Sequence, residues 1–312
     1  EQAELIARMK HKELTDPELH ELTQWLYDRP GKFDWDPATL AGLKEALHTI
    51  RCERALPAEL VAALAKHGSR SLEVWQKARK ENDWNSFAPY LTTTLELMRE
   101  KADWLVGAGI GKTRYESLLL EFERGFTLTE VDATLGELRR ELPPLVHTAL
   151  RSVNQPDTGF LFAPYPVDVQ ERVCREIITA MGFDWTKGRM DVSAHPFTTN
   201  VAPSTARITN RYDIHNLSDA LYSAIHEAGH ALYEQGIPSE WGWTPIGTSG
   251  GMALHESQSR FWEVCIGRSM DFSRWCYGIL KREFPNTLKY VSAEDMYRAV
   301  NMANVHYIRC DS

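Results

Sequence analysis

Residues 217–238 read LSDALYSAIHEAGHALYEQGIP, and this stretch decides both the fold and the chemistry that we expect of the chain. It predicts one helix. Ser218 or Asn216 can cap the start of that helix. Gly236, followed by Pro238, can end it.

Within this helix lies His226-Glu227-Ala228-Gly229-His230, an HExxH motif. Residues four apart lie about 6 Å apart along one helix face, so both imidazoles can reach one ion. Glu227 lies beside that face, where a carboxylate can take a proton from water that zinc has made acidic, with a pKa near about 7. The small residues Ala228 and Gly229 let another segment approach closely. The motif predicts a zinc-dependent peptidase, and the alternative is a surface helix with two unrelated histidines.

A third metal ligand has to come from another element, because a catalytic zinc usually takes three protein ligands. Glu234 is eight residues from His226, about 12 Å along the helix axis, which is too far for both to bind one ion. The sequence HESQS at 255–259 opens an amphipathic stretch and offers Glu256. Spacing alone does not favour Glu256 over Glu240 or Glu263.

The rest of the chain predicts a mainly α fold in one large domain covering residues 1–312. Asp16 can cap a helix that begins at Pro17. Alternating stretches at 189–193 and 207–212 predict a small sheet set into the helical body. Further helices are expected at 85–105, 131–142, 167–182 and 292–309, with Pro143 and Pro144 kinking or ending the second of these. Residues 237–252 predict a long loop whose Trp241 and Trp243 pack on the core, with a lid as the alternative.

Composition excludes several other classes of protein. The chain has 312 residues and a formal net charge of −8, which argues against binding nucleic acid because that needs clustered Lys and Arg. No apolar run approaches the roughly 18 residues of a transmembrane helix, so no membrane partner is expected. The five cysteines contain no CxxC, which predicts reduced thiols and a cytoplasmic protein.

HEAGH followed by HESQS, and preceded by His195-Pro196-Phe197, resembles the carboxypeptidase Taq family of metallocarboxypeptidases. Other stretches share the resemblance: TDPEL, LPAELV, WQKAR, FAPYL, GRMDVSAHPFTTNVAPST, RITNRYD and IRCDS. The resemblance implies a helical body with a deep groove and a small β-sheet beside the metal site. It also implies a homodimer that removes single residues from peptide C-termini, with zinc or a substitute such as cobalt.

The resemblance also implies roles for individual residues. It makes His226, His230 and Glu256 the metal ligands and Glu227 the catalytic base, and so selects Glu256 among the candidate acids.

Three more residues take roles by resemblance. Arg309 matches an arginine suited to bind the substrate's terminal carboxylate, with a surface ion pair as the alternative. His195 would line the site, with a buried structural histidine as the alternative. His255 would be a partner that orients a ligand.

Two departures from the family pattern stand out. Thr205 stands where the family's DxRxT pattern has Asp, which puts in doubt a salt bridge bracing the strand of Arg207. Family members also extend beyond both ends of these 312 residues, including a GxxQDxHW motif absent here. The chain is therefore expected to be an interior portion of a longer protein.

Two other functions compete with a carboxypeptidase. One is an HExxH zinc endopeptidase with a groove open at both ends. The other is a helical binding module whose metal site is inactive or structural.

Overall fold

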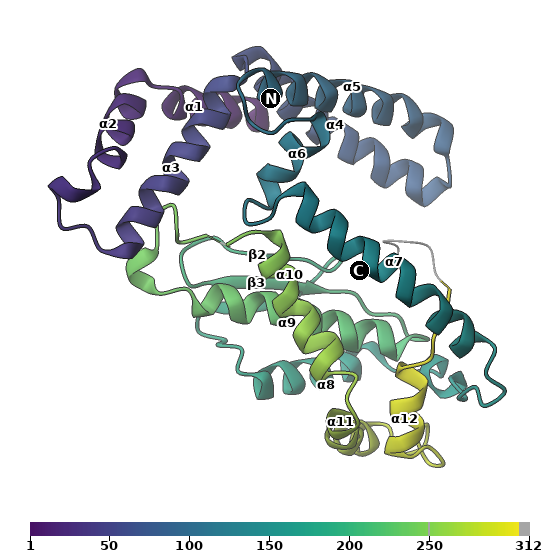
Figure 1. The fold of residues 1–312 in the computed structure, drawn as a ribbon. Helices are drawn as coiled ribbons and strands as arrows, with labels where there is room; N and C mark the ends of the chain where they lie inside the picture. The colour runs from purple at the N-terminus through teal and green to yellow at the C-terminus, as the bar shows by residue number, and fades with distance from the viewer. Residues whose placement is uncertain (249, 306–312) are drawn as a thin grey trace. The chain divides into compact units, whose positions relative to one another are not determined.

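The computed structural model describes residues 1–248 and 250–305 and confirms a mainly α fold with a small sheet (Figure 1). Contacts between Cα atoms divide the chain into two compact units, Glu1–Leu128 and Thr129–Ser312. The single domain and the deep groove stay predictions. No helix in the described ranges is both long and apolar enough to cross a membrane.

The first unit is a set of helices in which α4 packs against both α1 and α5. Asp16 begins α2 as predicted, because its side chain accepts hydrogen bonds from the backbone N–H groups of Glu18 and Leu19. The elements of this unit are α1 (Gln2–Leu14), α2 (Pro17–Tyr27), η1 (Pro30–Lys32), α3 (Pro37–Ala55), α4 (Ala58–Glu81), α5 (Trp84–Gly107) and α6 (Arg114–Phe122).

The second unit contains the motif-bearing helix and the sheet. Its helices are α7 (Leu128–Leu150), α8 (Val167–Met181), α9 (Leu217–Gly236), α10 (Met252–Arg260), α11 (Met270–Glu283) and α12 (Ala293–Val300). Its short turns are η2 (Gly159–Phe162), η3 (Ser239–Trp241) and the π-helical η4 (Phe261–Ile266).

Two helix ends differ from prediction. The helix α7 continues through Pro143 and Pro144 to Leu150. These prolines and the residues one turn before them are exposed, so water can bind the carbonyl oxygens that lose their helical partners. The last helix of the described residues, α12, ends at Val300, where the side chain of Asn301 donates to the carbonyl oxygen of Tyr297; residues 306–309 of the predicted helix lie outside the described ranges.

The sheet lies against α9 and has the strand order β1-β3-β2, with β1 at Gly188–Val192, β2 at Thr198–Thr199 and β3 at Ala206–Asn210. The strands β1 and β3 are parallel, and Figure 1 labels β2 and β3 near α9. The antiparallel strand β2 was not predicted, and it pairs Thr198 with Ile208. The predicted small sheet is confirmed, and β2 brings Thr198 next to α9.

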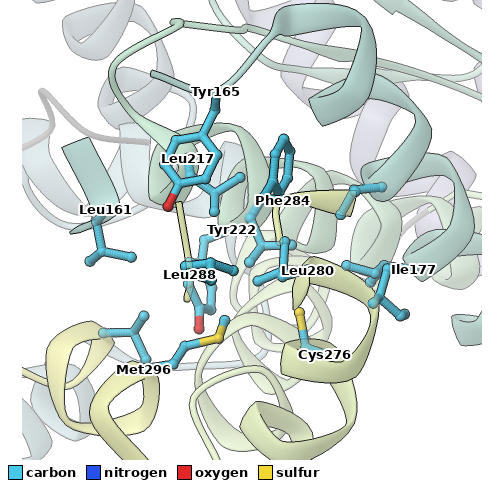
Figure 2. Close-up of a cluster of buried hydrophobic side chains, with 14 of the residues drawn as sticks. Leu161, Tyr165, Ile177, Leu217, Tyr222, Cys276, Leu280, Phe284, Leu288 and Met296 are labelled. Atoms are coloured by element: carbon cyan, nitrogen blue, oxygen red, sulfur yellow. The ribbon is translucent and has the colours of Figure 1, made fainter. Parts of the chain in front are cut away.

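The helix α9 is buried on two sides, which holds the motif rigidly. Toward the sheet it presents Ala220, Ala224, Ala228 and Ala231, whose small side chains let the sheet and α8 approach closely. Toward α11 and α12 it presents larger residues, which join the cluster drawn in Figure 2. A helix buried this way is fixed by packing rather than by its own propensity.

The long loop between α9 and α10 corrects one expectation. Trp243 is 85% exposed and Trp241 is 38% exposed, so the prediction that both rings pack on the core is wrong. Gly242 lies so close to Pro203 that a Cβ atom there would be 2.5 Å from the Pro203 Cβ. The backbone of this turn, and not the Trp243 indole, therefore fills the space beside Pro203.

Candidate metal centre

Three side chains that the sequence singled out come together on one side of α9. The Glu256 Oε2 atom lies 3.3 Å from His230 Nε2 and 3.8 Å from His226 Nε2. Within the described ranges these residues form the group that could hold a metal ion, with all ligand atoms within 4.8 Å of one another. Tetrahedral bonds of about 2.1 Å separate ligand atoms by about 3.4 Å, so the donors fit such an ion. Two imidazoles and one carboxylate are also the donor set of many catalytic zinc sites.

The segment 252–267 reaches these histidines because it runs antiparallel to α9 along one line of contacts. The contacting pairs are Tyr222–Gly267, His226–Glu263, Gly229–Ser259, His230–Glu256 and Glu234–His255. At the centre of this line, a Cβ atom on Gly229 would lie 2.7 Å from the Ser259 Cα atom. Only glycine allows this approach, which confirms that the small residue of the motif lets a second segment come close.

Glu227 is buried beside the histidines and is held by the sheet. The Thr198 hydroxyl donates to Glu227 Oε2 at 2.5 Å and also lies 3.0 Å from the Glu227 carbonyl oxygen. Burial raises the pKa of Glu227 above its usual value, and the Thr198 hydrogen bond works in the opposite direction. A carboxylate in this environment is a stronger base than an exposed one.

A second acid, Glu263 on η4, holds His226 from the side away from Glu256. The Glu263 Oε2 atom accepts from His226 Nδ1 at 2.9 Å. Burial, the largest single effect, opposes charge on both groups. Their hydrogen bond and the neighbouring charges together outweigh it, raising the pKa of His226 and lowering the pKa of Glu263. Arg260 and Arg268 also lower the pKa of Glu263.

The surroundings of His230 differ. Its Nδ1 atom is buried and has no hydrogen-bond partner among the described residues. Its ring stacks on His255, with the ring centroids 4.4 Å apart and the planes at 17°. Burial, followed by the nearby charges of His255 and His226, lowers the pKa of His230 to about 4. A low pKa keeps this imidazole neutral, as a metal ligand must be.

His255 is itself held by an acid that spacing had excluded as a ligand. The Glu234 Oε1 atom lies 2.9 Å from His255 Nε2, and Asn200 donates to the other oxygen of Glu234 at 2.8 Å. Burial, the largest single effect, would raise the pKa of Glu234. The hydrogen bonds to these two partners and the nearby charges of His255 and His230 together outweigh it and lower that pKa. Glu234 continues the histidine row on α9, and that periodicity was the available signal that it faces the site.

The remaining candidate acids fall outside the cluster. Glu240 is exposed in η3, and Glu263 binds His226 Nδ1 instead of joining the ligand set. Sequence reasoning missed Thr198 and Asn200. Their only signal is their place in the TTN segment beside the predicted sheet.

Three other predicted features have different outcomes. His195 is exposed, so the alternative of a buried structural histidine is wrong. Arg309 lies outside the described residues. Thr205 makes hydrogen bonds with the backbone of Ala202, and no ion pair to Arg207 is found within the described ranges.

Comparison with known sequences places this chain among metallopeptidases. The family described as carboxypeptidase Taq (M32) metallopeptidase matches residues 1–312. Thermostable carboxypeptidase 1 of Thermus thermophilus is 35% identical over 98% of this chain, which spans 61% of that protein. Thermostable carboxypeptidase 1 of Pyrococcus furiosus is 34% identical over 85% of this chain, which spans 52% of it.

Solved structures agree with the sequences. The crystal structure of an M32 carboxypeptidase from Deinococcus radiodurans covers 96% of this chain at 34% identity, with a TM-score of 0.83, and 59% of that chain is matched. The crystal structure of BsuCP covers 99% of this chain at 29% identity, with a TM-score of 0.91, and 62% of it is matched. The chain thus spans about three fifths of the length of these relatives.

Proposed function

The chain belongs to the carboxypeptidase Taq (M32) metallopeptidase family, and we propose that it releases single residues from peptide C-termini with the help of a zinc ion. The proposal depends chiefly on the ligand atoms of His226, His230 and Glu256 lying within 4.8 Å of one another. Co²⁺ is proposed as a substitute metal. The chain spans only part of the length of these relatives, so their whole-protein activity is a proposal for it.

Glu227 is the proposed base. A bound zinc ion supplies Lewis-acid chemistry, polarising the peptide carbonyl and making water acidic near neutral pH. Glu227 accepts a proton from the water whose oxygen bonds to the carbonyl carbon. It returns that proton to the leaving nitrogen as the C–N bond breaks. Thr198 supports this role by directing Oε2 of the carboxylate.

Selection of chain ends is proposed for residues that the family resemblance singled out. Arg309 is proposed to bind the terminal carboxylate through two parallel hydrogen bonds, which a guanidinium forms well. His195 is proposed to contact the substrate, and its exposure leaves the imidazole accessible. His255 is proposed to support His230 by ring stacking.

The experiment that tests the function compares peptides of one sequence with free and amidated C-termini, using the zinc-loaded protein and mass spectrometry of the products. We expect stepwise loss of C-terminal residues from the free peptide only. Internal cleavage of both peptides would instead identify an endopeptidase. Stoichiometric zinc with neither product would identify a binding module.

Glu227→Gln tests the base separately from the metal. Because the amide cannot take the proton, turnover should fall by about 10²–10⁴-fold while zinc content stays unchanged. Glu240→Gln is the matched control, since it removes an exposed acid outside the cluster. Unchanged turnover in Glu227→Gln would remove this residue from the mechanism.

The assembly and the location are also proposals. A homodimer is proposed, and sedimentation at several protein concentrations tests it.

A cytoplasmic location is proposed with the support of Cys52, Cys174, Cys265 and Cys276, which are all free thiols.

A further inference from the structure

Glu263 occupies an unusual place in the segment that follows Glu256. It lies in η4, the six-residue π-helical turn Phe261–Ile266 that directly continues α10. Such turns are rare and often occur at functional sites. Its side chain faces α9 and is 11% exposed, which is unusual for an acid outside an active site. A buried carboxylate here needs partners, and their arrangement indicates what the residue does.

The charge of Glu263 is balanced by cations, so the carboxylate can stay ionised. Arg260 Nη1 donates to Oε2 at 2.7 Å, and Arg268 Nη2 lies 3.5 Å from Oε1. An ionised carboxylate can only accept hydrogen bonds. His226 Nδ1 must therefore be the donor in the 2.9 Å contact. When the ring is neutral, this leaves its Nε2 atom with a free lone pair on the side of Glu256.

Arg268 is in turn held by rigid parts of the second unit. It donates to the carbonyl oxygen of Val300 at the end of α12. Its guanidinium lies 4.7 Å from the centroid of the buried Tyr222 ring, and the Tyr222 hydroxyl donates to the Gly267 carbonyl oxygen at 3.1 Å. Because these partners belong to the packed core, Glu263 cannot follow His226 if the imidazole turns.

We propose that Glu263 is a positioning residue for the metal centre: it fixes the tautomer and the ring orientation of His226 so that Nε2 is presented to the ion. This inference rests on the proposed metal site and does not depend on peptide cleavage. Within the described ranges His230 has no equivalent, since no carboxylate is hydrogen-bonded to its Nδ1 atom. Glu263 thus orients one ligand by a hydrogen bond without binding the ion itself.

Glu234 provides a matched control for this proposal. Glu263 and Glu234 have equally buried side chains, and each lies 2.9 Å from a histidine nitrogen. The difference is that Glu263 contacts a ligand histidine, whereas Glu234 contacts His255. Loss of either carboxylate should lower the stability of the metal-free protein, but loss of Glu263 should alter the ligand set more, because Glu234 reaches His230 only through the stacked ring of His255.

The experiment measures Co²⁺ and Zn²⁺ binding by chelator competition, together with the visible absorption bands of the Co²⁺ protein, in wild type, Glu263→Gln, Glu263→Asp and Glu234→Gln. Glu263→Gln should weaken both metals by about 10–100-fold and shift the Co²⁺ bands. Glu263→Asp should bind both metals more tightly than Glu263→Gln. Glu234→Gln should lose less than about tenfold in metal affinity.

Two outcomes would overturn the proposal, and they are distinguishable. If Glu263→Gln and Glu234→Gln lose equal affinity, in proportion to equal losses of metal-free stability, Glu263 is only a structural residue. The metal site itself then stands. If the wild type takes up neither ion, the proposed function and this inference fail together. Thermal unfolding of each metal-free variant shows whether it is folded.

Discussion

His226 and His230 lie one turn apart on α9, yet the molecule holds the two rings in different ways. The Nδ1 atom of His226 is hydrogen-bonded to Glu263, whereas the Nδ1 atom of His230 has no partner among the described residues. His230 is instead stacked on His255, with 4.4 Å between the ring centroids. One half of the site is therefore oriented by a hydrogen bond, and the other half by packing.

Because the two rings are held differently, they should be sensitive to different kinds of substitution. A hydrogen bond is directional, so removing one donor or acceptor group releases the ring or carboxylate it held. Packing depends on how closely two backbones approach, so adding a single methyl group at the contact can disturb it. Three substitutions separate these two kinds of support.

Gly229→Ala should have the largest effect, because it disturbs the close backbone contact that supports the His230 half of the site. The new Cβ atom would lie 2.7 Å from Ser259 Cα and 2.9 Å from the Gln258 carbonyl oxygen. These are backbone atoms, so α10 has to move and carry Glu256 with it. We expect a stability loss of about 1–3 kcal/mol. Zinc affinity should fall at least about tenfold, as measured by chelator competition.

Gly278→Ala on α11 is the control for that substitution. No atom lies within 4 Å of the position that a Cβ atom would take at Gly278, so alanine should be neutral or stabilise the helix by up to about 1 kcal/mol. If Gly229→Ala binds zinc as tightly as wild type, close approach of the two backbones does not hold the His230 half together.

Helical periodicity and cap residues were enough to predict α9, because both signals are local. The motif fixes two ligands for the same reason, since their spacing lies within one helix. The sequence also predicted the strands at 189–193 and 207–212. These features depend on residues that are close together along the chain, so they can be predicted from the sequence.

Spacing could not predict which acid would join the ligand set and which would hold a histidine. Glu256, Glu263 and Glu240 were equal candidates because spacing says nothing of how a second segment meets α9. The antiparallel contact at Gly229 decides where each acid lies. It places Glu256 beside the Nε2 atoms of His226 and His230, and Glu263 beside Nδ1 of His226. The role of Thr198 was equally hidden, because it depends on the pairing of a two-residue strand.

Thr198→Val should have an intermediate effect, and it tests a hydrogen bond that holds the base Glu227 rather than a ligand histidine. Valine keeps the shape and suits a strand, but it cannot donate to Glu227 Oε2. We expect kcat to fall about 10–100-fold, because a hydrogen bond to a charged group contributes roughly 1.5–3 kcal/mol. Zinc affinity should not change, since Thr198 contacts no ligand. Thr198→Ser keeps the hydroxyl and should stay close to wild type; a loss of kcat as large as that of valine would show that the methyl group matters instead.

Asn216→Ala should have the smallest effect and shows whether the contrast between the two halves is local. The Asn216 Oδ1 atom accepts from the Asp219 backbone N–H at 3.1 Å and caps the start of α9. Its loss should cost about 1 kcal/mol, or about 2–4 °C in Tm, while Asn216→Asp keeps the cap. Because the cap lies far along α9 from Gly229, zinc affinity should remain that of wild type. If alanine here weakens zinc as strongly as Gly229→Ala does, the metal responds to the stability of the whole helix, and the separate supports of His226 and His230 have no meaning.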